Sequence, residues 1–475
     1  MKVLFATSEI APWVKTGGLG DVAAALPPAL RQAGIDLRVL TPYYPAVRAA
    51  IPEARAPEVA KLGNFGGAYA DSVLRAAFAP DGSRLLLLDC PAYFDRPGNP
   101  YLGPDGKDWP DNYLRFGLLS RVAAWLGSKA NPFPWWPAVI HCNDWQTGLA
   151  PAYLKLSGDA RAKSIITVHN LAFQGLFSEQ TLPELGLPAH AWSMEGIEYH
   201  GYLSFLKAGL QFADAITTVS PTYAAEIQTD AEGMGMSGLL RHRADRLSGI
   251  LNGIDTEVWN PKRDAHLPFT YDIATLAAKR KNKSALQQEL GLTVRDDIPL
   301  FGVISRLTAQ KGLDLVAALE RQIADLPAQL AVLGSGDREL ENEFRRLAEI
   351  HPGHFATVIG FNEGLAHRIE GSVDVFLMPS RFEPCGLNQM YSLRYGTPPV
   401  VRATGGLADT VVDDVNGFVF EEATAAALFT AIQRAHAAWH NRERWRAMQI
   451  DGMSRDVSWT APAMQYAALY AKLKK

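Results

Sequence analysis

Two cations lie close together in the second half of the chain, directly after an apolar segment. Residues 300–304 read LFGVI, and residues 305–312 continue as SRLTAQKG, which contains Arg306 and Lys311. Arginine presents a planar fork of N–H donors and lysine a compact charge, so together they suit a leaving diphosphate. If residues 300–304 form a strand, its carboxyl end is where α/β proteins bind such ligands. We therefore predict a phosphate clamp here, with a basic surface loop as the alternative.

A carboxylate occupies a comparable position further along the chain. Glu383 lies in the run PSRFEPCGL, residues 379–387, which follows another apolar segment. Pro384 stiffens the chain on one side, and we expect a helix to begin at Cys385 and Gly386. A carboxylate held there can accept hydrogen bonds from sugar hydroxyls or stabilise positive charge on a glycosyl carbon. The alternative is an acidic helix cap without a chemical role.

A glycine-rich sequence occurs twice, as TGGLGD at residues 16–21 and as TGGLAD at residues 404–409. We expect each copy to precede a helix, where free backbone N–H groups and the helix dipole attract an anion. Glycine permits the close backbone approach that such binding needs. Lys15 precedes the first copy and could reach a diphosphate, although a loop lysine is usually only solvated. Two ordinary helix-entry turns are the alternative.

The run GLGDVA, residues 18–23, also matches the G-x-G-x-x-A fingerprint of dinucleotide-binding proteins, so an NAD-dependent oxidoreductase has to be considered. Its glycines should directly follow the first strand, but residues 10–16 intervene. The second strand should end in an acidic residue for the ribose, but it ends in Leu40, Thr41 and Pro42. The context of the fingerprint therefore argues against NAD.

Apolar, β-branched runs alternate with helical patterns along both halves of the chain. In the first half we expect strands at residues 3–7, 37–40, 85–88, 139–141, 165–169 and 215–219, with helices such as 21–32 and 112–126 between them. In the second half we expect strands at residues 300–304, 329–333, 357–359, 373–378 and 399–401. Strands followed by helices indicate parallel sheets covered on both faces. The predicted fold is α/β, with two Rossmann-like domains that face a central cleft holding the active site.

The predicted N-terminal domain covers residues 1–253 and the C-terminal domain residues 254–457. The turn-forming run NGIDTEVWNP, residues 252–261, marks the boundary. Residues 458–475 are expected to form an amphipathic helix that packs back toward the N-terminal domain. Its apolar residues would be Ala463, Tyr466, Leu469 and Leu473.

The composition is that of an ordinary globular enzyme. The 475 residues include 48% hydrophobic and 20% charged residues, with a formal net charge of −4. No basic excess marks a nucleic-acid surface, and no apolar stretch is long enough to span a bilayer. The three cysteines are far apart, which favours neither disulfides nor a zinc site and indicates a reducing compartment. The N-terminal run MKVLFATSEIAP is interpreted as a strand and not as a signal peptide, so we expect a cytoplasmic protein.

Several runs together resemble the bacterial glycogen synthases and plant starch synthases. They are KTGGL from Lys15, HCNDWQ from His141, HNLAFQG from His169, NGID from Asn252, the pair Arg306 and Lys311, and EPCGL from Glu383. They follow one another in order and span essentially the whole chain. This resemblance implies a two-domain GT-B fold and the transfer of glucose from ADP-glucose to the non-reducing 4-hydroxyl of an α-1,4-glucan. It also implies that the anomeric configuration is retained.

The resemblance implies roles for particular residues as well. Catalysis would involve Glu383, His169, Asp144, Arg306 and Lys311. The donor would be bound by Lys15, Gly18, Asp21, Asn252, Arg306, Lys311, Phe361, Glu383, Cys385, Gly386, Leu387, Asn388, Thr404, Gly405 and Gly406. The transferred glucose and the acceptor would contact Tyr101, Asp144, His169 and Asn170. Phe361 stands where some relatives carry tyrosine, so stacking on adenine is retained without a phenol hydroxyl.

Breaking a glycosyl–phosphate bond puts negative charge on the diphosphate and positive charge on the anomeric carbon. No convincing D-x-D motif follows a strand, so we expect protein cations to replace a metal ion, and no cofactor is expected. Retention allows front-face attack, in which the His169 carbonyl and the Asp144 carboxylate stabilise the carbon, or a covalent intermediate. The alternatives are a related retaining glucosyltransferase that uses UDP-glucose or another acceptor, and a glucan-binding protein without catalytic activity.

Overall fold

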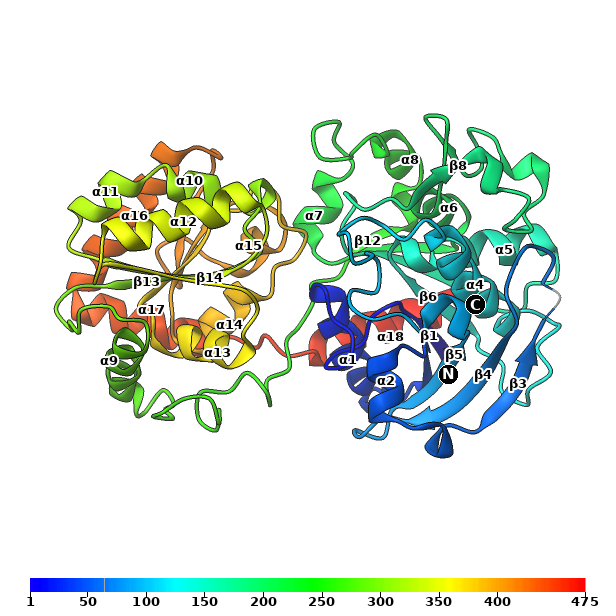
Figure 1. Ribbon diagram of the computed structural model, residues 1–475, viewed down its shortest axis with the longest axis horizontal. Helices are drawn as coiled ribbons and strands as arrows, with labels where there is room; N and C mark the ends of the chain where they lie inside the picture. The colour runs from blue at the N-terminus through cyan, green and yellow to red at the C-terminus, as the bar shows by residue number, and fades with distance from the viewer. Residues whose placement is uncertain (64, 475) are drawn as a thin grey trace. The chain divides into compact units, whose positions relative to one another are not determined.

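A computed structural model describes residues 1–63 and 65–474, which fall into two compact units (Figure 1). Unit 1 comprises Met1–Gly253 and Trp459–Lys475, and unit 2 comprises Ile254–Ser458. The chain leaves unit 1 between Gly253 and Ile254, inside the run NGID. Each unit has its own sheet and its own core.

Unit 1 is built on a nine-stranded sheet in the order β12-β11-β7-β6-β1-β2-β5-β4-β3. The strands are β1 (Lys2–Ala6), β2 (Asp36–Pro42), β3 (Glu58–Leu62), β4 (Ser72–Phe78), β5 (Arg84–Asp89), β6 (Val139–Asn143), β7 (Lys163–Val168), β11 (Ala215–Thr218) and β12 (Leu247–Gly249). The seven strands from β12 to β5 in this order are parallel to one another. At the other edge β4 is antiparallel to β3 and β5, because short connections allow hairpins there. The sheet is therefore mixed, which the sequence patterns did not reveal.

The inner strands of this sheet are apolar on both faces, as parallel strands covered by helices must be. In β1, for example, Val3, Leu4 and Phe5 are fully buried. The helices of unit 1 are α1 (Gly18–Gln32), α2 (Pro45–Ala50), α3 (Pro91–Phe94), α4 (Asn112–Leu126), α5 (Leu149–Ser157), α6 (Phe205–Phe212), α7 (Pro221–Glu226), α8 (Ser237–His242) and α18 (Thr460–Lys474). A small antiparallel sheet, β8-β10-β9, adds β8 (Leu176–Ser178), β9 (Glu198–Tyr199) and β10 (Tyr202–Ser204).

The C-terminal helix α18 belongs to unit 1 and lies beside α1 (Figure 1). Its buried side includes Ala463, Tyr466 and Tyr470, whereas Leu469 and Leu473 are only half-buried. The expected apolar stripe is therefore rotated toward Tyr470. The hydroxyl of Tyr470 lies 2.7 Å from Nδ1 of His141, a polar contact that pulls the tyrosine inward and that apolar periodicity alone does not predict.

Unit 2 contains a six-stranded sheet in the order β15-β14-β13-β16-β17-β18, and all of its strands are parallel. The strands are β13 (Leu300–Ile304), β14 (Gln329–Gly334), β15 (Phe355–Ile359), β16 (Val375–Met378), β17 (Pro399–Arg402) and β18 (Phe418–Phe420). The helices are α9 (Lys279–Glu289), α10 (Leu313–Ala317), α11 (Glu320–Asp325), α12 (Arg338–Ile350), α13 (Glu363–Ser372), α14 (Asn388–Arg394), α15 (Gly405–Thr410), α16 (Ala425–His440) and α17 (Arg442–Ser454). One apolar core packs β13 and β14 against α10, α12 and α16, and the other packs them against α9 and α13, on opposite faces (Figure 1).

All eleven strands expected from the sequence are present, with ends within two residues of their expected positions. The α/β prediction with two Rossmann-like domains is confirmed. One local expectation is wrong, because the helix expected at Cys385 and Gly386 begins only at Asn388. Gly386 has a φ of +69°, a left-handed conformation that cannot belong to an α-helix. None of the described helices is both long and apolar enough to cross a membrane.

Candidate active site

Three neighbouring strands of unit 1 end at the same edge of its sheet, and a candidate polar residue follows each of them. In the order β7-β6-β1, the strands are parallel and adjacent. His169 directly follows β7, Asp144 directly follows β6, and Glu9 lies three residues beyond β1. Because the carboxyl ends of parallel strands meet at one edge, the fold gathers these side chains there.

Asp144 is held in an unusual conformation between β6 and the turn that follows. Its backbone has a φ of 55° and a ψ of −172°, a backbone conformation that residues other than glycine rarely adopt. Its Oδ1 accepts hydrogen bonds from the backbone N–H groups of His169, at 2.7 Å, and Asn170, at 3.4 Å. Burial raises the pKa of Asp144 to about 7, although these two bonds favour the ionised form. The structure thus brings the predicted residues Asp144, His169 and Asn170 together.

Glu9 is the centre of a second polar cluster, which the sequence motifs did not predict. Its carboxylate accepts bonds from the Thr16 backbone N–H at 2.7 Å, the Thr16 hydroxyl at 2.6 Å and the Tyr101 hydroxyl at 2.5 Å. The Tyr101 hydroxyl also lies 2.9 Å from the hydroxyl of Ser8. Burial raises the pKa of Glu9, while the bonds from Thr16 and Tyr101 lower it. Glu9 therefore ties the predicted sugar residue Tyr101 to the loop that carries Lys15.

The donor residues predicted in unit 1 lie close to this loop or at the end of β12. Lys15 forms an ion pair with Asp21, with Nζ 2.7 Å from Oδ1, and both side chains are about one third exposed. Gly18 is the first residue of α1, so the helix begins inside the glycine-rich run. Asn252 follows β12 and is buried, and its Oδ1 has no hydrogen-bond partner among the described residues. A buried polar atom in this state is one that a ligand or a water can satisfy.

In unit 2 the structure brings Lys311 and Glu383 together. Lys311 follows β13 and Glu383 follows β16, and these strands are neighbours. The Nζ of Lys311 lies 2.5 Å from Oε2 of Glu383, and the Ser380 hydroxyl donates to the same oxygen at 3.0 Å. Only 7% of the Glu383 side chain is exposed, so the lysine is its compensating charge.

The second glycine-rich run packs directly against the Glu383 segment. The Gly406 N–H donates to the carbonyl oxygen of Glu383 at 3.3 Å. A Cβ atom at Gly405 would lie 1.9 Å from that same carbonyl oxygen, and Gly405 has a φ of +45°. Only glycine fits there. Cys385 is buried beside this contact, and Asn388 donates a hydrogen bond to the Ile304 carbonyl at 2.7 Å, which ties the start of α14 to the end of β13.

Two predicted residues of unit 2 stay apart from this cluster. Arg306 is exposed after β13 and forms no ion pair with any residue that the structure describes. Phe361 follows the edge strand β15 and is 80% exposed. Both lie at the carboxyl edge of the sheet, but the structure shows no contact between either side chain and Lys311 or Glu383.

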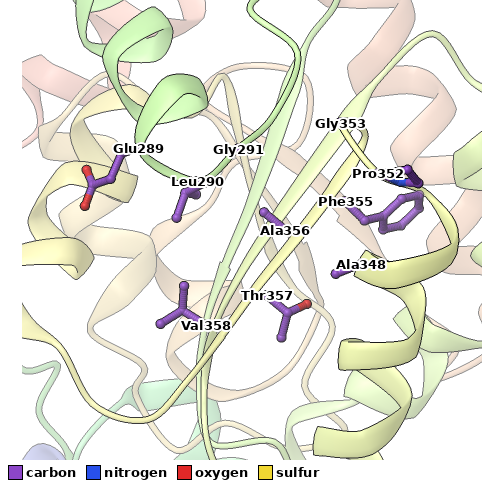
Figure 2. A pocket seen from close by; sticks show the side chains of 10 residues that line it. All are labelled: Glu289, Leu290, Gly291, Ala348, Pro352, Gly353, Phe355, Ala356, Thr357 and Val358. Atoms are coloured by element: carbon purple, nitrogen blue, oxygen red, sulfur yellow. The ribbon is translucent and has the colours of Figure 1, made fainter.

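A hollow of about 370 Å³ lies beside β15 (Figure 2). It is lined by residues from the end of α9, the end of α12 and β15: Glu289, Leu290, Gly291, Ala348, Pro352, Gly353, Phe355, Ala356, Thr357 and Val358. None of the predicted site residues lines it. The candidate chemistry of unit 2 therefore lies at the strand ends and not in this hollow.

Comparisons with known proteins agree with this arrangement along the whole chain. Residues 2–242 match the family described as starch synthase catalytic domain, and residues 289–449 match glycosyl transferases group 1. A glycogen synthase of Dechloromonas aromatica (strain RCB) is 58% identical over 99% of this chain and 98% of that relative. A glycogen synthase of Aromatoleum aromaticum (strain DSM 19018 / LMG 30748 / EbN1) is 53% identical over 100% of this chain and 97% of that relative. The chain belongs to the glycogen and starch synthase family.

A solved member of this family has the same fold. The catalytic domain of starch synthase IV from Arabidopsis thaliana, bound to ADP and acarbose, superposes with a TM-score of 0.86. It is 32% identical, and the match covers 100% of this chain and 99% of the other. The predicted family is thus confirmed, and the protein is a glycosyltransferase of the GT-B fold.

Within this synthase fold, two residues outside the predicted set contact predicted site residues. Glu9 follows the first strand six residues before Lys15, and a carboxylate so close to a strand end is a signal that could have been used. Ser380 binds Glu383 from three residues away and gave no such signal. Among the described residues, no three His, Cys, Asp or Glu side chains are grouped so that they could hold a metal ion.

Proposed function

We propose that this synthase transfers glucose from ADP-glucose to the non-reducing 4-hydroxyl of an α-1,4-glucan, with retention of the anomeric configuration and release of ADP. Two of its relatives are named glycogen synthase, and the solved starch synthase IV contains ADP and acarbose. ADP is the nucleotide that remains when glucose leaves ADP-glucose, which supports adenine as the donor base. We expect the reaction to take place in the cytoplasm, without a nucleic-acid or membrane partner.

The observation that carries this proposal is the contact between Lys311 and Glu383. A lysine 2.5 Å from a nearly buried carboxylate, at the carboxyl end of parallel strands, provides both charges that the reaction needs. The ammonium can bind the departing diphosphate, and the carboxylate can accept hydrogen bonds from the sugar or face its developing positive charge. Arg306 and Lys15 would add cations for the phosphates, and the helix start at Asn388 and the turn Thr404–Gly405–Gly406 would add backbone N–H groups.

The polar cluster of unit 1 suits a neutral sugar. Asp144 and His169 can bind hydroxyls of the transferred glucose, Asn170 shares the contact with Asp144, and Tyr101 belongs to the neighbouring Glu9 cluster. The buried Oδ1 of Asn252 is a further acceptor that a donor hydroxyl can satisfy. Phe361 presents an exposed ring on which an adenine can stack.

A related retaining glucosyltransferase that uses UDP-glucose or another acceptor is the second candidate. The test compares ADP-, UDP- and GDP-glucose as donors with glycogen as acceptor, and measures the release of the nucleoside diphosphate. We expect ADP-glucose to give the largest kcat/KM, and ADP release to require the glucan. A larger kcat/KM for UDP-glucose would replace the proposal with the second candidate, and no turnover with any donor would indicate a glucan-binding protein.

A further inference from the structure

Asn143, the last residue of β6, has a side-chain orientation that the surrounding backbone determines. One end of its amide lies 3.0 Å from the carbonyl oxygen of Ala6 and 3.4 Å from that of His141. Carbonyl oxygens only accept hydrogen bonds, so the NH₂ group must be at this end. The carbonyl oxygen of the amide, Oδ1, therefore points the other way.

The backbone of Asn143 is held as firmly as its side chain. Its N–H donates to the Thr147 hydroxyl at 2.6 Å, and that hydroxyl donates back to the Asn143 carbonyl at 2.9 Å. The residue is fully buried. Rotation of the amide would cost both bonds of its NH₂ group in a site that water does not reach.

The orientation of this amide decides which ring nitrogen of His169 carries a hydrogen. The Nε2 of His169 lies 2.9 Å from Oδ1 of Asn143, an atom that can only accept. Nε2 must therefore carry the hydrogen. In a neutral imidazole the other nitrogen, Nδ1, then has a free lone pair. The ring is neutral at neutral pH, since burial lowers the pKa of His169 to about 3.

No residue that the structure describes forms a hydrogen bond with Nδ1 of His169. His169 itself is half-buried and lies beside Asp144, whose Oδ1 binds the His169 backbone N–H. Nδ1 is thus an acceptor without a partner among the described residues, on a ring that lies beside the candidate sugar residue Asp144.

We propose that Asn143 is a positioning residue that holds His169 as the Nε2–H tautomer, so that Nδ1 accepts a hydrogen bond from a sugar hydroxyl. The tautomer is assigned from hydrogen bonds within the protein alone. The statement that a sugar hydroxyl binds Nδ1 rests on the proposed function. The site then selects a hydroxyl that donates, and rejects a group of similar size that cannot donate.

The tautomer can be measured in the ligand-free protein. Histidine labelled with ¹⁵N is incorporated, and long-range ¹H–¹⁵N correlation spectra identify which ring nitrogen of each of the 11 histidines carries a hydrogen. The His169 signals are assigned as those missing from His169→Gln. We expect the Nε2–H pattern at neutral pH. An Nδ1–H pattern, or a doubly protonated ring at neutral pH, would overturn the proposal whatever the variants do.

Replacement of Asn143 by alanine should change both the spectrum and the reaction. Without Oδ1, His169 should become a mixture of tautomers, and kcat should fall by up to about tenfold, the limit set by complete loss of one hydrogen bond to the sugar. Cys142→Ala is the matched control, since Cys142 is a buried neighbour on β6 and, among the described residues, forms no hydrogen bond with His169; its spectrum and its kcat should stay close to wild type. An Asn143→Ala protein with an unchanged Nε2–H signal and unchanged kcat would contradict the assignment.

Analogues of ADP-glucose test the proposed hydrogen bond from a sugar hydroxyl to Nδ1 of His169. Fluorine replaces one glucose hydroxyl of ADP-glucose at a time, since fluorine cannot donate a hydrogen bond. At one position we expect kcat/KM to fall about tenfold for the wild type and to change little for His169→Ala. A wild type that tolerates fluorine at every position would refute the hydroxyl contact. An Nε2–H signal in a protein that transfers no glucose would refute the proposed function instead, and leave the role of Asn143 intact.

Discussion

The two units hold their site carboxylates in opposite ways. In unit 2, Glu383 lies against a cation, with Lys311 Nζ at 2.5 Å. In unit 1, Glu9 and Asp144 are nearly buried as well, but among the described residues neither forms an ion pair. N–H and O–H groups hold them instead, and burial raises the pKa of both.

This difference matches the charges of the ligands that each unit is proposed to bind. A diphosphate carries permanent negative charge, so a cation must already be present where it leaves. A glucose unit is neutral, so carboxylates that accept hydrogen bonds are sufficient to bind it. The comparison predicts that removal of charge is most costly in unit 2, and that pH matters most in unit 1.

The largest effect is expected for Lys311→Ala. Loss of one group that stabilises transition-state charge should lower kcat by about 10²–10³, and the same holds for Arg306→Ala. Steady-state kinetics with ADP-glucose and glycogen measure it, with the exposed Lys281→Ala as control. Because Lys311→Ala also leaves Glu383 uncompensated, the double variant Lys311→Met/Glu383→Gln should recover stability but not kcat. Near-normal kcat in either single variant would contradict the proposed phosphate clamp.

The next largest effect is a pH dependence of the free energy of unfolding that Asp144 causes. Its pKa is about 7 in the folded protein and lies near 3.8 for an ordinary aspartate. The folded state therefore holds this proton more tightly, so its contribution to stability is present below about pH 4 and is lost as pH rises to about 7. The free energy of unfolding of Asp144→Asn, relative to wild type, should rise over this range by on the order of 2–4 kcal/mol.

Urea unfolding of both proteins between pH 4 and 9 measures this difference. Asn170→Ala is the control, since it keeps the carboxyl and only removes a neighbouring side chain, and it should follow the wild type at every pH. A constant difference between Asp144→Asn and wild type across the range would show that Asp144 is already ionised at low pH.

A smaller effect is expected for Glu9→Gln. The amide of glutamine cannot accept the three hydrogen bonds that the carboxylate accepts from Thr16 and Tyr101, so the loop with Lys15 should loosen. The KM for the donor should rise about tenfold, with a smaller change in kcat. Tyr101→Phe is a useful comparison, because it removes one of these bonds without touching the loop, and its donor KM should change less. Equal donor KM values for Glu9→Gln and wild type would rule out this role.

The smallest effect is expected for metal removal. If Lys311, Arg306 and Lys15 neutralise the diphosphate, ADP release from ADP-glucose should be the same with and without EDTA. Loss of activity in EDTA, with recovery on addition of Mg²⁺ or Mn²⁺, would show that protein cations are not sufficient in unit 2.

Much of the fold was readable from local patterns. Every expected strand is present, because an apolar run between turn residues is a local signal. The predicted start of α14 was wrong by three residues, since the amino-acid sequence does not show that Gly386 adopts a left-handed φ. The antiparallel strands β3 and β4 were missed, because their apolar patterns are weak: the edge strand β3 has only one buried residue and β4 has three.

The sequence by itself determined which residues follow strands, and so which side chains reach the sheet edges: Lys311 and Glu383 were selected this way, whereas Asp144 and His169 came from the family resemblance. The tertiary structure decided which of them meet. Lys311 and Glu383 are 72 positions apart, and Glu9 and Tyr101 are 92 apart, so their contacts depend on strand order and loop packing. The tautomer of His169 depends on a carbonyl oxygen of β1 that orients Asn143 on β6. Contacts of this kind arise only when distant segments are buried together, because burial then obliges each polar group to find a partner.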